Sequence, residues 1–144
     1  MKVVINACHG GFGLSHKAIM RYAELKGIKL YPWLDNTAIE IWGKEILNKS
    51  WEEIEKEGCC IHYTTVPKEE YEKLKEEEKE TVYFSDWEIE RTDPILIQVV
   101  EELGKEANDR CSKLKIVEIP DEVDFYIDEH NGKEWIAEKH RTWE

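Results

Sequence analysis

The chain has 144 residues, of which 41% are hydrophobic and 10% aromatic, and this composition predicts one globular domain rather than a disordered chain. Its formal net charge of −12 opposes attraction to polyanions, so we expect neither a nucleic-acid polymer nor an anionic membrane surface as a partner. A small phosphorylated ligand is compatible with this charge, because a few local cations suffice to hold it.

The four cysteines, at positions 8, 59, 60 and 111, form neither a Cys-x-x-Cys pair nor a zinc-ligand spacing with the five histidines. We therefore expect reduced thiols, no metal and no cofactor. The sequence has no basic-then-apolar N-terminal segment and no apolar run of about 18 residues, the length that a membrane-spanning helix needs. These absences predict a cytoplasmic protein.

The chain begins with an apolar run that predicts a strand at residues 2–7, followed by the glycine turn GGFGLS at residues 10–15 and a helix at 15–26. Glycines before a helix N-terminus can cradle a phosphate, since the backbone approaches closely and offers free N–H groups. The spacing matches neither the dinucleotide fingerprint nor the P-loop. A tight turn with Ser15 as N-cap is therefore the favoured interpretation of this stretch alone.

The middle of the chain alternates short elements. Residues 28–33 and 59–65 are predicted strands, 37–47 are ambiguous, and Ser50 with Glu53 forms a capping box that starts a short helix closed by Gly58. Pro67 opens a predicted helix, 68–80, made almost entirely of Lys and Glu. Residues 81–89 read as a strand or a loop.

The last third holds the clearest elements. Asp93 and Pro94 start the strongest predicted helix, 95–107, and a strand at 114–119 follows. Residues 123–129 and 133–140 predict a hairpin with a type I′ turn at Asn131-Gly132, in which Ile127 faces Ile136. We predict one α/β domain of the α+β kind over residues 1–144. It has a mixed sheet, an N-terminal strand, glycine turn and helix, a long central helix and a C-terminal hairpin.

Residues suited to a nucleotide lie near the ends of the central helix. Arg91 and Arg110 offer planar forks for a diphosphate, Asn108 can read adenine or a ribose hydroxyl, and Phe84 or Trp87 can stack a base. Each residue taken singly is better explained by a cap, a surface ion pair or the core. The combination predicts a nucleotide site.

Catalytic candidates are fewer. Glu138 and His140 share one face of a predicted strand, and His16 lies at the glycine turn, but no known active-site motif contains them. We expect no enzyme activity. Two alternatives stay open: an enzyme that degrades a cyclic nucleotide or phosphoester signal, and an acidic inhibitor that binds a protein.

The glycine turn with the following KAIMRYAELKG, the segment TDPILIQVVEELG at 92–104 and the ending HRTW at 140–143 resemble a family of small phage proteins. These are the Thoeris anti-defence sponges, which sequester cyclic ADP-ribose signals made by bacterial TIR-domain enzymes. The resemblance covers most of the chain and is weakest between residues 31 and 79.

The resemblance implies a non-catalytic binder in the host-cell cytoplasm during phage infection. It would hold glyco-cyclic ADP-ribose isomers intact in recessed pockets of a homo-oligomer built from dimers, and some members also hold cyclic oligonucleotides at a separate site. Phe84 would stack the base and Arg110 would form the polar clamp, with Arg91 and Asn108 as further contacts. Phe12 and His16 would lie on a pocket or subunit wall.

Overall fold

The first strand pairs with a strand from the other end of the chain. In the computed structural model, which describes residues 1–139, β1 (Lys2–Asn6) runs antiparallel to β4 (Leu114–Glu118), with Val4 opposite Ile116. Val3 and Val4 are completely buried, as an apolar run predicts for an inner strand.

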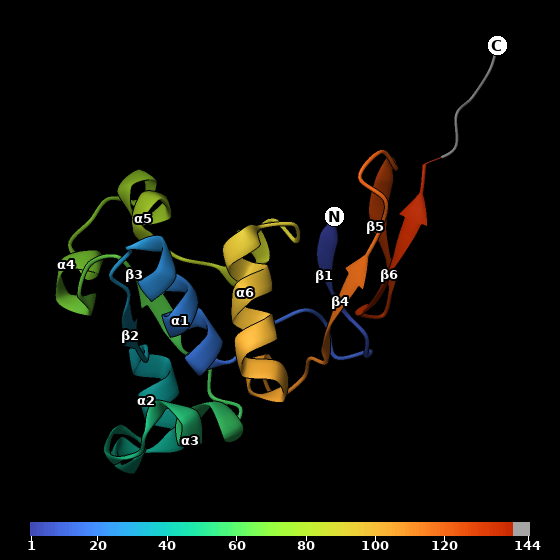
Figure 1. Cartoon of the computed structure of the whole chain (residues 1–144). Coiled ribbons are helices and arrows are strands. Elements are labelled where there is room, and N and C mark those ends of the chain that lie inside the picture. The colour runs from blue at the N-terminus through green and yellow to red at the C-terminus, as the bar shows by residue number, and fades with distance from the viewer. Residues whose placement is uncertain (140–144) are drawn as a thin grey trace.

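The C-terminal hairpin packs beside β1 (Figure 1). Its strands are β5 (Phe125–His130) and β6 (Lys133–Glu138), and the predicted register, with Ile127 opposite Ile136, is confirmed. Asn131 and Gly132 have φ angles of 50° and 88°, as a type I′ turn requires. The predicted hairpin position of His140 lies outside the described residues.

Two capped helices form the centre. α1 (His16–Lys26) begins where the Ser15 side chain accepts a hydrogen bond from the Ala18 N–H, and α6 (Pro94–Leu103) begins with Asp93 accepting from the Ile95 N–H. Both predicted N-caps are therefore confirmed. α6 ends four residues earlier than predicted, because Gly104 adopts a φ of 56° and the chain continues as the 3₁₀ helix η3 (Gly104–Ala107).

Short elements make up residues 31–88. The strands β2 (Tyr31–Trp33) and β3 (His62–Thr64) pair antiparallel. The helical elements between and after them are α2 (Asn36–Trp42), η1 (Lys44–Asn48), α3 (Trp51–Lys56), α4 (Lys68–Glu72), α5 (Glu76–Val82) and η2 (Asp86–Glu88). The ambiguous stretch 37–47 is thus helical, and Ser50 caps α3 as predicted.

The predicted helix 68–80 is broken into α4 and α5. Only Tyr71 and Leu74 are apolar between residues 68 and 80, so little burial rewards a continuous helix there. The break returns the chain to the β2–β3 pair, where Tyr83 forms an isolated bridge with Thr64.

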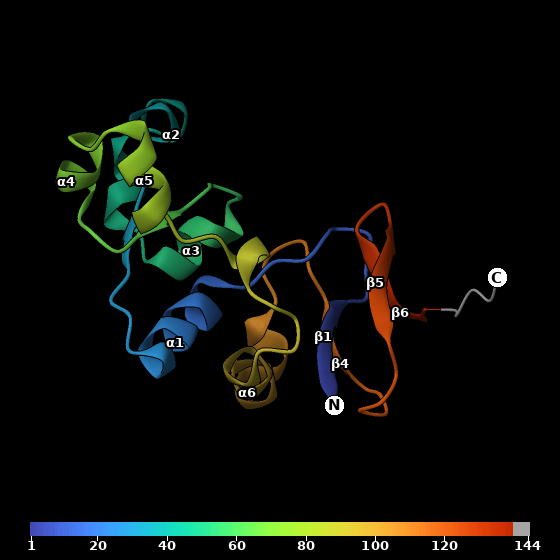
Figure 2. The same ribbon diagram turned by 90° about the horizontal axis from the view of Figure 1, so that it is seen from above.

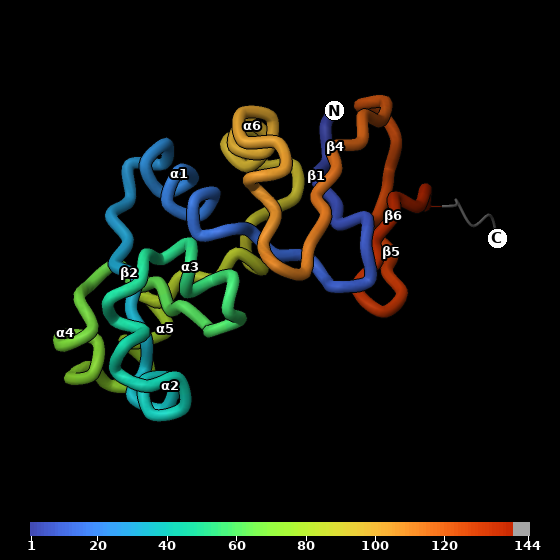
Figure 3. Tube along the Cα trace, turned by 90° about the horizontal axis from the view of Figure 1, so that it is seen from below, coloured from blue at the N-terminus to red at the C-terminus, as the bar shows by residue number. Residues whose placement is uncertain are grey.

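The three strand pairs stay separate. Each is a two-stranded antiparallel sheet, so the described residues contain no parallel pairing and no mixed sheet, whereas the α+β class and the single compact domain are confirmed. The physical reason is the path of the chain. After β1 it crosses past α6 to the opposite half of the molecule, so β2 never lies beside β1 (Figures 2 and 3).

α6 lies between these two halves (Figures 1 and 2). One half contains β1, β4 and the hairpin, and the other contains α1 to α5 with β2 and β3. The main core packs around Val4, Leu96 and Val99, and a smaller core gathers around Ile46 and Ile54. Within residues 1–139, no helix combines the length and apolar character needed to cross a membrane.

Candidate functional site

The glycine turn does present its backbone N–H groups to anions, but the anions belong to the protein itself. The Leu14 N–H donates to Asp86 Oδ2 at 2.9 Å, and the His16 N–H at the start of α1 donates to the Glu55 carboxylate. These are the donors that a phosphate at a helix N-terminus would use. A phosphate could bind there only by displacing both side chains.

Close packing requires glycine at position 10 of the turn. A Cβ at Gly10 would overlap the backbone carbonyl of Cys111, and one at Gly13 would overlap the Asp109 carboxylate. The turn and the loop after η3 therefore lie directly against each other. This contact brings Asp109 beside Asp86 and Glu55.

A recessed pocket of about 320 Å³ lies beside the turn, and we call it the glycine-turn pocket. Three predicted ligand residues, Phe12, Phe84 and Trp87, line it together. Its other lining residues are Gly13, Leu14, Ile19, Glu55, Cys59, Cys60, Ile61, Tyr63, Tyr83, Ser85, Asp86 and Asp109. Trp87 is 69% exposed and available to a ligand, whereas the Phe12 ring is buried.

Carboxyl groups dominate the charge of the pocket. Burial raises the pKa of Asp86 and of Glu55 above the ordinary carboxyl range, and the nearby negative charge of Asp109 adds to both shifts. Such a lining offers hydrogen-bond acceptors and repels anions. It therefore favours the hydroxyl and amino groups of a ligand over its phosphates.

Arg110 lies at the border of this pocket. The Arg110 guanidinium packs directly on Gly58, next to the pocket residues Cys59 and Cys60. Arg110 is exposed and forms no ion pair within the described part of the chain. It can therefore meet a phosphate at the edge of the pocket.

The Asn108 side chain has a structural role instead of facing the pocket. Its side-chain oxygen accepts the Leu114 N–H at 2.8 Å, at the start of β4.

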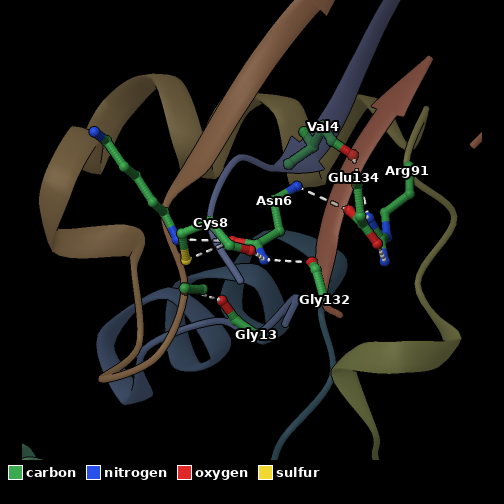
Figure 4. A network of polar contacts seen from close by, with 9 residues as sticks. Val4, Asn6, Cys8, Gly13, Arg91, Gly132 and Glu134 are labelled. Carbon is green, nitrogen blue, oxygen red and sulfur yellow. Dashed lines mark hydrogen bonds and ion pairs between the residues drawn. The ribbon is translucent and has the colours of Figure 1, made fainter. Parts of the chain in front are cut away.

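Arg91 is also occupied. Its guanidinium forms a two-pronged ion pair with Glu134 on β6, at 2.5 and 2.9 Å (Figure 4). The same group lies 3.6 Å from the centre of the Phe12 ring. Both charged side chains are largely buried, at 15% and 9% exposed. The pair fastens the hairpin to the glycine turn rather than facing the glycine-turn pocket.

A second buried side chain, that of Asn6, also joins the hairpin to the rest of the fold. The Asn6 side chain, fully buried, donates to the carbonyls of Cys8 and Gly132 at 2.7 and 2.8 Å and accepts the Lys113 N–H at 2.8 Å (Figure 4). One amide thus ties the end of β1 to the hairpin loop and to the residues before β4.

His16 is a hydrogen-bonded core histidine. Its ring packs against Trp51 and Tyr63, and its Nδ1 lies 2.8 Å from the Tyr63 hydroxyl. Burial lowers the pKa of His16, so the ring is neutral at pH 7. It lines a different hollow, on the outer side of α1, and not the glycine-turn pocket.

The catalytic pair expected at Glu138 and His140 has one described member. Glu138 lies on β6 opposite Phe125, and His140 is outside the described residues. Residues 1–139 contain no group of three His, Cys, Asp or Glu side chains placed to hold a metal ion.

The residues that sequence reasoning missed come from segments far apart in the chain. Glu55, Asp86 and Asp109 converge only in the folded molecule, and no spacing in the sequence relates them. Tyr83 lies in an aromatic-rich stretch, but its partner His62, and Asp35 as the partner of His62, are distant in the sequence and are brought together only by the fold.

Comparison of the chain with protein-family models, curated proteins and solved structures gives no match.

Proposed function

We propose that the protein binds cyclic ADP-ribose isomers in the glycine-turn pocket and sequesters them without cleavage. The observation that carries the proposal is the meeting of Phe12, Phe84 and Trp87 in one recess, although they come from segments more than 70 residues apart. The resemblance of the turn and central helix to the phage sponges supports the same ligand class. It also supports action in the host-cell cytoplasm as an assembly of dimers.

The charge of the pocket determines how such a ligand would lie. Its ribose or base would enter, with hydroxyl and amino groups donating to Asp86 and Asp109 and the base stacked on Trp87 or Phe84. Its phosphates would face outward, toward Arg110. If the dianionic ligand entered with its phosphates first, the carboxyl groups of Glu55, Asp86 and Asp109 would repel them.

The size of the recess favours a ligand that extends beyond it. A volume of about 320 Å³ is at the lower end for small-molecule sites. The adjoining hollow of about 630 Å³ shares Tyr83, Phe84 and Ser85 with it, so a larger ligand can continue past these residues.

Calorimetry with cyclic ADP-ribose isomers, followed by heat denaturation and chromatography of the supernatant, tests this function. We expect binding and recovery of the unchanged ligand. Absence of binding to every isomer would contradict the proposal, and recovery of a linear product would instead support the enzyme alternative.

The variant Trp87→Ala tests the placement of the site. If Trp87 stacks the base, its removal should weaken binding by roughly 5- to 150-fold, the usual range for one stacked base. Trp135→Ala is the matched control, since that tryptophan is also exposed but lies on the hairpin. Equal affinities of Trp87→Ala and the control would place the ligand elsewhere.

A further inference from the structure

Tyr83 lines three hollows at once. It borders the glycine-turn pocket, the 630 Å³ hollow beside α1 and a further hollow of about 500 Å³ against α5. The residue is 37% exposed, and its backbone is fixed by the bridge to Thr64. A ligand that extends from one hollow into another must pass this side chain.

The Tyr83 hydroxyl is the end of a hydrogen-bonded relay. It lies 2.8 Å from Nδ1 of His62, and Nε2 of the same ring lies 3.0 Å from Asp35 Oδ2. The other oxygen of Asp35 accepts the Ala38 N–H at 2.7 Å as the N-cap of α2, which fixes the carboxylate. The His62 ring is held flat against Trp33, with 4.6 Å between ring centres.

The position of each proton follows from this geometry. The hydrogen bonds from Ala38 and His62 keep the pKa of Asp35 below the ordinary value, so Asp35 is ionised and only accepts. A neutral His62 ring beside this acceptor must carry its proton on Nε2. Its Nδ1 is left as an acceptor, and the phenol of Tyr83 must donate to it.

The phenol keeps its proton at neutral pH, because burial raises the pKa of Tyr83 and the negative charge of Asp86 adds to this shift. Its single hydrogen is committed to His62. The Tyr83 oxygen therefore offers only lone pairs to anything else that approaches it.

We propose that the Asp35–His62–Tyr83 relay makes Tyr83 an obligate hydrogen-bond acceptor in the ligand site, selecting a hydroxyl or amino group at this position and excluding a phosphate. The inference rests on the proposed function, since it requires a ligand in these hollows. Tyr83 is the contacting residue, and His62 and Asp35 are positioning residues. The carboxyl groups of the glycine-turn pocket likewise favour hydroxyl and amino groups over phosphates.

The relay itself can be tested without ligand by long-range ¹H–¹⁵N correlation NMR of the His62 ring at pH 8. The wild type should show the Nε2–H tautomer. Asp35→Asn preserves an N-cap for α2 but turns a donating amide toward Nε2, so the proton should move to Nδ1 and release the Tyr83 hydrogen. An Nδ1–H tautomer in the wild type, or no change in Asp35→Asn, would overturn the relay.

The selection is tested by calorimetry with cyclic ADP-ribose and analogues that each lack one ribose hydroxyl or the base amino group. For the analogue that lacks the group bound by Tyr83, the wild type should lose roughly 2- to 12-fold affinity, the effect of one hydrogen bond. Tyr83→Phe should bind this analogue and the parent equally, while the control Tyr126→Phe, on the exposed hairpin, should discriminate as the wild type does.

Two outcomes separate the inference from the proposed function. Binding by the wild type together with unchanged discrimination in Tyr83→Phe would overturn the inference alone. Absence of wild-type binding to every nucleotide would overturn the proposed function, and the selection with it.

Discussion

At the scale of single residues, the structure separates side chains that hold the fold together from those that face the pocket. Arg91 and Phe12 stack on each other, and Arg91 pairs with Glu134 in the most buried ion pair of the described residues. Trp87 and Arg110 are exposed beside the glycine-turn pocket. Loss of ligand binding in an Arg91 variant would therefore not distinguish a lost ligand contact from weakened packing between the hairpin and the glycine turn.

Removal of Arg91 should be strongly destabilising. Arg91→Met leaves the Glu134 carboxylate buried without its partner, and we expect a loss of about 3–5 kcal/mol in the free energy of unfolding, measured with urea. Arg91→Met combined with Glu134→Gln should lose less than Arg91→Met alone, because no charge is then stranded and an acceptor for the Asn6 N–H remains. A loss below about 1 kcal/mol in Arg91→Met would contradict a structural role.

Asp86 should make the folded state less stable as the pH rises. A carboxyl group whose pKa is raised by folding binds its proton more tightly in the folded state, so stability falls as the pH rises from the ordinary carboxyl range through the raised pKa. Asp86→Asn removes this loss and keeps an oxygen to accept the Leu14 N–H.

Urea unfolding at several pH values between 4 and 7 measures the effect. The free energy of unfolding of Asp86→Asn should fall less, or rise more, over this range than that of the wild type. Asp124→Asn, at an exposed aspartate before β5, is the control. Parallel curves for Asp86→Asn and the wild type would show that folding does not raise the pKa of Asp86.

At the scale of elements, the glycine turn is a structural joint. Its N–H groups are satisfied by carboxylates from α3 and η2, and the hairpin turn packs onto it, since a Cβ at Gly132 would lie 2.6 Å from the His9 carbonyl oxygen. Three distant segments thus depend on one bend. The N–H groups that could cradle a phosphate are thus occupied by the protein's own carboxylates, and the turn is the tight, Ser15-capped turn that the sequence favours.

Two glycines of the turn should differ in their tolerance of alanine. Gly10→Ala would drive a methyl group into the Cys111 carbonyl, whereas Gly11→Ala meets open space and only strains a φ of 90°. We expect a loss of about 1–2 kcal/mol in unfolding free energy for Gly11→Ala and a larger one for Gly10→Ala. A larger loss in Gly11→Ala would show that close packing at residue 10 is not the limiting constraint.

At the scale of the molecule, the two cores suggest unequal local stability. Val4, Leu96 and Val99 belong to a core that joins both halves, whereas Ile46 and Ile54 belong to a smaller cluster under α2 and α3. Small clusters bury less apolar area and open more readily. The segment that carries Asp35 and Glu55 thus lies over the weaker core.

Amide hydrogen exchange measures this difference. Leu96→Ala should cost about 2–5 kcal/mol and speed exchange throughout the protein, including the slowest amides. Ile54→Ala should speed exchange first in α2 and α3 and least in β1 and α6. Uniform acceleration by both variants would mean that the two cores unfold together.

The sequence alone determined the elements whose signals are local. The Ser15, Ser50 and Asp93 caps and the Asn131-Gly132 turn depend on residues within a few positions of one another, and all four are confirmed. The same local signals gave a wrong prediction for the charged stretch 68–80. A continuous helix there would need a buried apolar face, and this stretch has almost none.

Tertiary structure decided the rest, because strand partners and sites depend on contacts across the whole chain. The pairing of β1 with β4, the separation into three small sheets and the convergence of Glu55, Asp86 and Asp109 on the glycine turn have no counterpart in residue spacing. The sequence supplied the residue types of a nucleotide site. Only the fold decided that Phe84, Trp87 and Arg110 lie in or beside one recess, while Arg91, Asn108 and His16 hold the structure in place.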